Sequence, residues 1–409
     1  MDFDDSPDEA AWRTSVRSYL TAHRDELGDR GARNGRDDVP MAKKSQACLF
    51  DGGFVGVTWA PGLGGQGGTP MQQAIVDQEM GKAGVPSLIN MIGIGMCGPT
   101  VIAHGSDEQK QRYLRRLLRG EDIWCQLFSE PASGSDLAAL RTKATRVEDG
   151  SWRISGQKVW TTGAQISDYG IILTRTNPDV AKHKGLTMFV VDMHAPGVTV
   201  RPLRQMSGGA DFNEVFFDDV VIPDSERLGD VDSGWRVALT TLMSERLSLG
   251  GGGTDIGMGM GIDSIIAHTA RQISGLSPER QALVRQDLGR AYVASLGIRY
   301  TGYRQLSAIS RGEAPGPEAS AGKLAGTVAS RAMTDLGVRL LGDDAVYATT
   351  ADGTGTWQHL QAVLPGMAIA GGTDQVLRNV LGERVLGLPT EPRSDKIAPV
   401  RPNPAGAHQ

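Results

Sequence analysis

The hydrophobic pattern of this 409-residue chain changes its period twice. Over residues 7–121, apolar side chains recur at the spacing that places them on one face of an α-helix. Over residues 123–232, apolar and polar residues alternate, and Gly, Asn, Asp and Pro separate the short runs, which is typical of β-strands joined by turns. From residue 234 to about 387 the helical spacing returns. The chain is therefore expected to fold into a β domain between two helical domains.

The pattern and the turn residues also place the individual elements. Helices are expected over residues 7–27, 41–52, 72–84, 87–105 and 106–120, and strands over residues 143–147, 152–155, 169–174, 187–192, 198–202 and 214–221. Ser106 and Gln109 have the spacing of a capping box, which supports the start of the last of these helices. The strands are predicted to form an antiparallel all-β domain. The expected division is a helical domain at 1–122, the β domain at 123–233, a second helical domain at 234–388 and a polar tail at 389–409.

Composition limits the partners that the chain can have. With 40% hydrophobic and 22% charged residues it is expected to be a soluble globular protein, and its net charge of −5 offers no basic surface for nucleic acid. Three cysteines are too few for a disulfide framework or a metal site, and the histidines lack ligand spacing. The N-terminus is acidic where a signal peptide would be basic, and the longest apolar patch, residues 85–97, is too short to cross a bilayer. We therefore expect a cytoplasmic protein with no metal, nucleic acid or membrane partner.

Residues 124–163 combine the features needed to hold a flat ring with polar edges. An apolar run is followed by the turn S-E-P-A-S-G-S-D at 129–136, and a second strand carries G-Q-K-V-W-T-T-G at 156–163. The turn offers backbone amides and hydroxyls to polar edge atoms, Trp160 offers a face for stacking, and the Thr hydroxyls can reach the atom at which electrons arrive. Considered alone, Trp160 would be read as an ordinary core residue. Its position after Gly-x-Lys and before Thr162 favours a binding role.

These two motifs resemble, in order and spacing, those of the flavin-binding middle domain of the acyl-CoA dehydrogenase family, T-E-P-x-A-G-S-D and G-x-K-x-W-I-T-N. The phrase G-S-D-E-Q-K-Q-R-Y-L at 105–114 extends the resemblance into the first helical domain. The resemblance implies an α+β multi-domain fold, with an N-terminal α-helical domain, a middle antiparallel β-sheet domain and a C-terminal helical bundle, and FAD as the cofactor. By resemblance, the residues that contact FAD are Gln126, Phe128, Ser129, Gly134, Ser135, Trp160, Thr162, Arg271, Thr373 and Gln375.

The family reaction removes a proton next to a thioester and passes a hydride to the flavin, so it requires a carboxylate base in a dry pocket. In much of the family this base is a Glu before a Gly-Thr-x-Gln segment, but here the segment reads A-G-G-T-D-Q at 370–375 and places Gly371 at that position. The branch that resembles isovaleryl-CoA and long-chain dehydrogenases carries a Glu before an Arg on a helix after the β domain, where this chain has S-E-R-L at 244–247. The resemblance therefore predicts Glu245 as the base. The alternative is an exposed Glu–Arg pair on an amphipathic helix.

Substrate contacts are predicted from the same resemblance, at Ser135, Arg246, Gly371 and Gly372. A glycine at position 371 leaves room beside the reacting carbons for a carboxylate that arrives from another helix. Its backbone N–H can still donate to the thioester oxygen, because that donor needs no side chain.

Two segments depart from the family pattern. The Arg-Lys-Thr-Phe-Gly segment, which sends an Arg to the flavin pyrophosphate of a neighbouring subunit, reads R-Q-I-S-G at 271–275, and the Gln-x-x-Gly-Gly segment that meets the adenosine reads R-L-L-G-D at 339–343. Weaker or rebuilt contacts to the FAD phosphates are expected. The glycines at 250–253, 257, 259 and 261 lack the preceding strand and the following Lys of a phosphate-binding loop, and they indicate close helix packing instead.

The resemblance as a whole predicts an FAD-dependent acyl-CoA dehydrogenase of fatty acid metabolism that forms a 2,3-enoyl thioester. It implies a homodimer or homotetramer, with an electron-transferring flavoprotein as electron acceptor. The acyl group is expected to be branched, long or bulky. Two alternatives are left open: an oxygen-using flavin oxidase or monooxygenase of the same fold, and a non-catalytic subunit of a heteromeric dehydrogenase.

Overall fold

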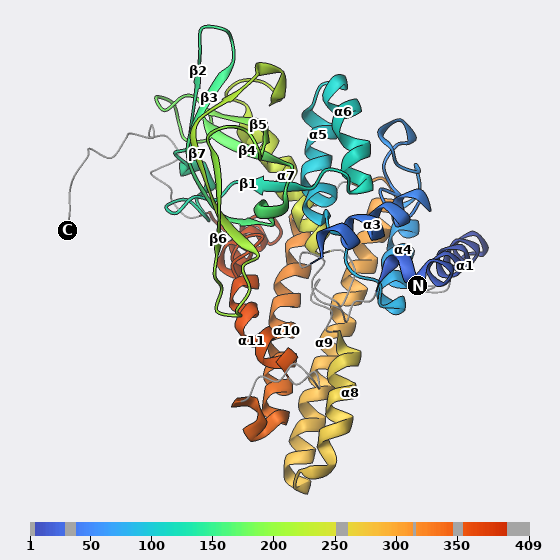
Figure 1. Ribbon diagram of the computed structural model, residues 1–409. Coiled ribbons are helices and arrows are strands. Elements are labelled where there is room, and N and C mark those ends of the chain that lie inside the picture. The colour runs from blue at the N-terminus through green and yellow to red at the C-terminus, as the bar shows by residue number, and fades with distance from the viewer. Residues whose placement is uncertain (1–4, 29–37, 251–260, 314–315, 347–354, 391–409) are drawn as a thin grey trace, which may run out of the picture.

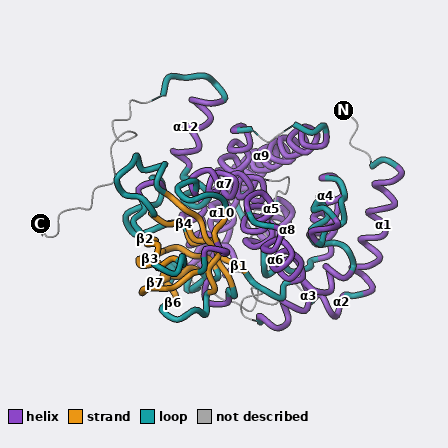
Figure 2. The backbone as a smooth tube through the Cα atoms, turned by 90° about the horizontal axis from the view of Figure 1, so that it is seen from above, coloured by secondary structure: helices purple, strands orange, loops and turns teal. Residues whose placement is uncertain are grey.

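The computed structural model describes residues 5–28, 38–250, 261–313, 316–346 and 355–390, with the backbone alone described for 246–250 and 355. Figure 1 shows helices of the N-terminal part on one side, a twisted sheet on the other, and long C-terminal helices that project away from both. In the view of Figure 2, helices α7 (Gly234–Gly250) and α10 (Ser320–Leu341) lie between the sheet and the N-terminal helices. Most of the glycine-rich segment, 251–260, and the tail from 391 lie outside the described residues.

The N-terminal helices follow the predicted pattern with two differences. They are α1 (Pro7–Ala22), α2 (Arg24–Leu27), α3 (Val39–Asp51), α4 (Pro70–Ala83), the π-helical turn η2 (Gly93–Cys97), α5 (Gly98–His104) and α6 (Asp107–Arg119). The capping box that begins α6 is confirmed, because Ser106 and Gln109 each accept a hydrogen bond from the backbone N–H of the other. The predicted helix at 7–27 is broken at His23, whose backbone leaves the helical region at φ −109° and ψ 23°.

Asn90 explains the second difference and joins the helical domain to the sheet. This residue is buried, and its Nδ2 donates to the carbonyls of Leu117 and Asp122 at 2.8 and 2.9 Å. Its Oδ1 accepts from the Trp124 N–H at 2.9 Å. These bonds hold residues 89–90 in a turn, so the helix predicted at 87–105 begins only after Asn90.

The sheet contains all the predicted strands, in the order β6-β7-β3-β2-β4-β5-β8, with β1 paired to β4 off this path. The strands are β1 (Trp124–Leu127), β2 (Lys143–Arg146), β3 (Trp152–Thr162), β4 (Tyr169–Arg175), β5 (Leu186–Asp192), β6 (Val198–Leu203), β7 (Phe212–Ile222) and β8 (Arg227–Leu228). The expected antiparallel pairing holds for most neighbours, but β1 and β2 pair with β4 in parallel. Long connections rather than hairpins join these strands, so their direction is not imposed locally.

The C-terminal part is a set of long helices. Besides α7 and α10 it contains α8 (Ile262–Gln272), α9 (Pro278–Ser310), α11 (Gly355–Met367) and α12 (Asp374–Arg384). The end of α8 and the start of α9 lie at the tip of the projection, farthest from the sheet (Figure 1). None of the helices in the described ranges is long and apolar enough to span a bilayer. Short 3-10 turns connect elements throughout: η1 (Pro61–Leu63), η3 (Leu137–Ala139), η4 (Ala164–Ile166), η5 (Asp224–Glu226), η6 (Ile273–Gly275), η7 (Pro317–Ala319) and η8 (Gly342–Val346).

One hydrophobic cluster joins the helical domain, the sheet and α7. Val237 and Ala238 of α7 are fully buried and belong to the same cluster as Val101 of α5 and Met188 of β5. Burying a side chain of the size of Val or Met contributes about 1.5–3 kcal/mol. Helix α7 is thus fixed in both position and rotation between α5 and the sheet.

Candidate active site

Strand β1 carries the first predicted cofactor residues toward α7. Gln126 lies on the same face of β1 as Trp124, the face covered by α5, α6 and α7, and is half-buried. Phe128 is only 5% exposed and packs in the core, so a ligand can contact its backbone but not its ring. Ser129 is half-buried, and within the part of the chain that the structure describes its N–H and hydroxyl make no hydrogen bond.

A buried ion pair joins the two motif segments. Lys158 of β3 is fully buried; its Nζ lies 2.9 Å from Glu130 Oε1 and donates to the Phe128 carbonyl at 3.0 Å. Glu130 also accepts from the N–H groups of Arg141 and Thr142 at 2.6 and 2.8 Å. Burial lowers the pKa of Lys158 to about 8, against the opposing influence of Glu130. Desolvation raises the pKa of Glu130, but the Lys158 charge and these donors outweigh it, and the net shift is downward.

Neither member of this pair was assigned a role from the sequence, although a signal was present. Lys158 has the same strand parity as Trp152 and Ile154, both buried core residues. A lysine on the buried face of a strand requires a carboxylate partner. Extending the alternation beyond the predicted strand at 152–155 would have indicated that this lysine belongs to an internal pair.

Trp160 occupies a strained and exposed position. Its φ is +59°, and the pairing of β3 with β7 shifts register between Lys158 and Thr161, so the strand bulges at this point. The indole is 60% exposed and meets Phe212 edge-on at 5.9 Å. The alternative of an ordinary core residue is therefore wrong. A non-glycine residue in the left-handed region costs about 1–2 kcal/mol, and such strain is typical of ligand-binding sites.

The predicted base, Glu245, faces the β domain. Ala238, Thr241 and Glu245 lie on one stripe of α7, and Thr241 is buried with its hydroxyl 2.8 Å from that of Thr100. Continuing this buried stripe brings the half-buried Glu245 to Gln126, whose Nε2 lies 3.5 Å from Glu245 Oε2. The alternative of an exposed Glu on an amphipathic helix does not fit this placement.

The segment that would otherwise carry the base is a glycine turn between α11 and α12. Gly371 and Gly372 have φ values of +65° and +92°, which favour glycine strongly. Lys323 of α10 donates to the Gly372 carbonyl at 3.0 Å and pairs with Asp374 at 3.2 Å, both members being largely buried. Thr373 caps α12 by accepting from the Val376 N–H at 3.2 Å. A glutamate at position 371 would have to adopt a backbone conformation that side chains disfavour.

Several predicted residues are not brought to this place within the chain. Arg271 is exposed in the last turn of α8, the end that lies farthest from the sheet. Arg339 pairs with Asp287 of α9 at 2.8 Å. Gly134, Ser135 and Gln375 are exposed, and the side chain of Arg246 lies outside the described residues.

The residues that do meet form a surface that fits a flavin ring. Val159 N–H donates to the Ser129 carbonyl at 2.9 Å, so Ser129 lies beside the strand segment that carries Trp160. The exposed indole and the half-buried Thr162 therefore lie on the strand beside Ser129, whose N–H has no hydrogen-bond partner among the described residues. An apolar face with adjacent donors matches a ring that is apolar on its faces and polar at its edge.

Comparison with known protein families agrees with this arrangement along the chain. Residues 6–121 match the acyl-CoA dehydrogenase N-terminal domain, residues 125–220 the middle domain and residues 232–386 the C-terminal domain. A β domain between two helical domains, with the Ser129 and Trp160 segments side by side in the β domain, defines the class of protein as a flavoenzyme.

Relatives identify the family directly. The chain is 33% identical over 344 residues to acyl-CoA dehydrogenase IpdE1 of Mycobacterium tuberculosis, covering 84% of this chain and 87% of that protein. It is 39% identical over 353 residues to acyl-CoA dehydrogenase FadE34 of the same organism, covering 85% of this chain but only 46% of the length of that relative. The chain belongs to the acyl-CoA dehydrogenase family, whose members are FAD-dependent oxidoreductases.

Solved structures are also similar over almost the full chain. A structure described as the Tcur3481-Tcur3483 steroid ACAD superposes with a TM-score of 0.79 at 26% identity, covering 96% of this chain and all of that one. The ChsE4-ChsE5 complex from Mycobacterium tuberculosis superposes with a TM-score of 0.77 at 27% identity, with the same coverage. The fold predicted from the sequence is thus confirmed.

Proposed function

We propose that this chain oxidises an acyl-CoA thioester to the 2,3-enoyl thioester with Glu245 as the base. The observation that carries the proposal is the 3.5 Å approach of Gln126 Nε2 to Glu245 Oε2, which brings the carboxylate of α7 to the strand that leads into the flavin cradle. FAD, when bound, accepts the hydride.

Each residue of the site has a task that follows from its placement. Glu245 accepts the proton from the carbon next to the thioester carbonyl, and its partial burial limits access of water. Gln126 donates to the carboxylate and so orients it. The turn at Gly371 and Gly372, which Lys323 holds in place, offers backbone N–H donors to the thioester oxygen.

The remaining contacts are assigned by family position. We assign FAD binding to Gln126, the Phe128 backbone, Ser129, Gly134, Ser135, Trp160, Thr162, Thr373, Gln375 and, from a neighbouring subunit, Arg271, and substrate binding to Ser135, Arg246, Gly371 and Gly372. The exposure of Trp160 supports the first group, and so does the Ser129 N–H, which no group in the described part of the chain accepts. The domain limits 1–122, 123–233 and 234–388 are retained as part of the proposal.

The acyl group is proposed to be bulky. Position 371 carries no side chain where much of the family has a glutamate, and its φ of +65° disfavours one. The first of the similar solved structures is described as a steroid ACAD. A ring-bearing acyl-CoA is therefore the first substrate class to test.

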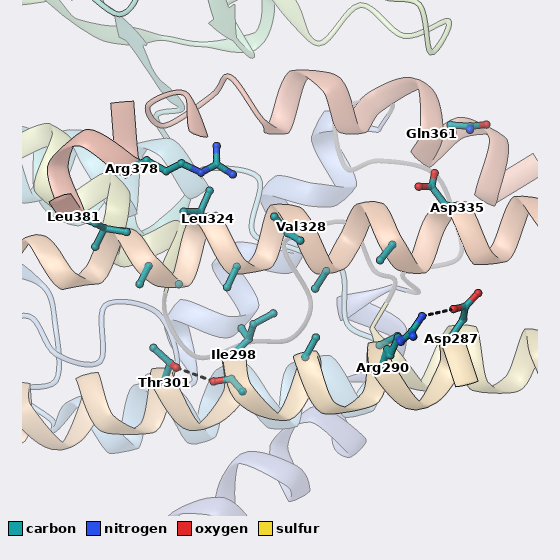
Figure 3. Close-up of a pocket in the computed structure, with 18 of the residues that line it drawn as sticks. Asp287, Arg290, Ile298, Thr301, Leu324, Val328, Asp335, Gln361, Arg378 and Leu381 are labelled. Carbon is teal, nitrogen blue, oxygen red and sulfur yellow. Dashed lines mark hydrogen bonds and ion pairs between the residues drawn. The ribbon is translucent and has the colours of Figure 1, made fainter. Parts of the chain in front are cut away.

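A second subunit is proposed to cover the groove between α9 and α10. Figure 3 looks into this groove of about 1150 Å³, with small apolar side chains along both helices and Arg378 and Leu381 of α12 at its side. Helix α9 buries only Ala291, Ser295 and Gly302, while Val328 of α10, which lines the groove, is 55% exposed. Apolar surface on this scale marks an interaction site, and we propose a homodimer or homotetramer.

An electron-transferring flavoprotein is proposed as the electron acceptor on family resemblance. A cytoplasmic location is proposed because all three cysteines are buried and free, as expected in a reducing compartment. The two alternatives, an oxygen-using flavoenzyme and a non-catalytic subunit, are not favoured, because the first relatives are named acyl-CoA dehydrogenases and the chain retains a carboxylate, Glu245, within 3.5 Å of Gln126.

The decisive experiment is anaerobic bleaching of the bound flavin by a panel of acyl-CoA thioesters, with Glu245→Gln beside the wild type. The variant should bind FAD and thioester but lose flavin reduction by several orders of magnitude, because a glutamine cannot accept the proton. Glu148→Gln, an exposed carboxylate in the turn between β2 and β3, is the matched control and should reduce its flavin normally. Bleaching at the wild-type rate in Glu245→Gln would exclude Glu245 as the base.

A further inference from the structure

Lys158 and the neighbouring strand hold the backbone on both sides of Ser129. Lys158 Nζ donates to the Phe128 carbonyl at 3.0 Å, and the Val159 N–H donates to the Ser129 carbonyl at 2.9 Å. The two peptide planes that meet at Ser129 are therefore both fixed to β3.

The direction of one donor follows from this arrangement. The Phe128 carbonyl and the Ser129 N–H belong to the same trans peptide and point in opposite directions. Because Lys158 is fully buried, the carbonyl points into the protein, and the N–H points the other way, toward the half-buried side of Ser129. Among the described residues this N–H has no hydrogen-bond partner, so it is presented outward next to the strand segment that carries Trp160.

Stability alone does not account for a buried charge pair here. Replacing such a pair by apolar residues of similar volume is often neutral or stabilising. An apolar residue at position 158, however, could not hold the Phe128 carbonyl. Glu130, with its two backbone donors from Arg141 and Thr142, keeps the ammonium group charged and in place.

We propose that Lys158, held by Glu130, is a positioning residue that aims the Ser129 N–H at the polar edge of the flavin ring, strengthening FAD binding and favouring the reduced ring. The inference relies on the proposed function for the presence of the flavin, and not on Glu245 or on the acyl substrate. Reduction adds negative charge at the polar edge of the ring. A donor that is already aimed there stabilises the reduced form more than the oxidised form, because nothing has to reorganise.

The test uses the full-length protein, the single variant Lys158→Met and the double variant Lys158→Met with Glu130→Gln. The single variant leaves a buried carboxylate unpaired and is expected to unfold more easily. The double variant removes both charges and should recover most of the thermal stability of the apoprotein. If the pair is a positioning device, the double variant should still bind FAD about tenfold more weakly, the equivalent of about one hydrogen bond, and its flavin should have a more negative reduction potential.

Lys182→Met is the matched control. Lys182 is also largely buried, and it pairs at 2.8 Å with Asp136 of the turn at 129–136. It does not hold the Phe128 carbonyl, to which Lys158 alone donates among the described side chains. Its flavin reduction potential should stay at the wild-type value. A double variant with wild-type FAD affinity and potential would show that the pair is structural only and would overturn the proposal.

A measurement on the wild type does not depend on any variant folding. Hydrogen exchange at the Ser129 amide, resolved to single residues by mass spectrometry, should slow when FAD is added. Unchanged exchange with FAD bound would overturn the positioning role and leave the proposed function intact. A wild-type protein that binds no FAD at all would overturn both.

Discussion

Trp160 provides a test of backbone strain, because its left-handed conformation reverses the usual order of alanine and glycine. At φ +59° an alanine keeps a steric cost of about 1–2 kcal/mol that glycine does not pay. Glycine in turn loses about 0.5–1 kcal/mol through its greater freedom in the unfolded chain. The Trp160→Gly protein should therefore be more stable than the Trp160→Ala protein by about 0.5–1 kcal/mol.

Arg153 supplies the control in the same strand. It is exposed and does not have a positive φ, so Arg153→Gly should be less stable than Arg153→Ala by about 0.5–1 kcal/mol. Urea unfolding of the four apoproteins, followed by circular dichroism, measures both differences. Each compares two variants at one site, so the loss of the original side chain cancels.

The binding of FAD separates strain from function. Both Trp160 variants lack the exposed indole, and the loss of an aromatic contact of about 0.5–1.5 kcal/mol should weaken FAD binding about two- to tenfold in each. Glycine no more stable than alanine at position 160 would refute the strain argument. Unchanged FAD affinity would refute the stacking role.

Three further perturbations test other parts of the structure. Lys323→Met leaves the buried Asp374 carboxylate unpaired, so the free energy of unfolding should fall by about 3–5 kcal/mol and acyl-CoA turnover should also fall. Adding Asp374→Asn should restore stability. Although burial opposes the shift, hydrogen bonds from Arg17, Lys82 and Arg13 lower the pKa of Glu79 from 4.5 to about 2. The ionised carboxylate therefore stabilises the fold above pH 4.5, and this contribution is lost as the pH falls toward 2. The urea midpoints of wild type and Glu79→Gln should converge over that range. Val328→Arg places a charge in the groove between α9 and α10 and should dissociate the oligomer in light scattering, whereas Val221→Arg on β7 should not.

The contradicting results differ for the three. Full turnover in a folded Lys323→Met protein would show that the glycine turn does not need this anchor. A constant difference in urea midpoint between wild type and Glu79→Gln from pH 6 to pH 2 would show that the Glu79 carboxylate is not the titrating group. An intact oligomer in Val328→Arg would place the interface elsewhere.

Features that depend on neighbouring residues were predictable from the sequence. The change of period predicted the order of domains, because burial of one face requires a spacing of 3.6 in helices and 2 in strands. The capping box at Ser106 and the two flavin motifs are local patterns with fixed spacing, and both motifs lie where the sequence places them. The glycine at 371 and the Glu at 245 were likewise present in the sequence, and the catalytic assignment remains a prediction.

Features that depend on distant partners required the tertiary structure. Gln126 and Glu245 are 119 residues apart and meet only because α7 packs between α5 and the sheet. The parallel pairing of β1 with β4 and the bulge against β7 that exposes Trp160 are likewise set by distant contacts. The spacing of apolar residues indicates which face of a helix or strand is buried, but it does not indicate which segment covers that face. The free energy of such a contact depends on the residues of both segments.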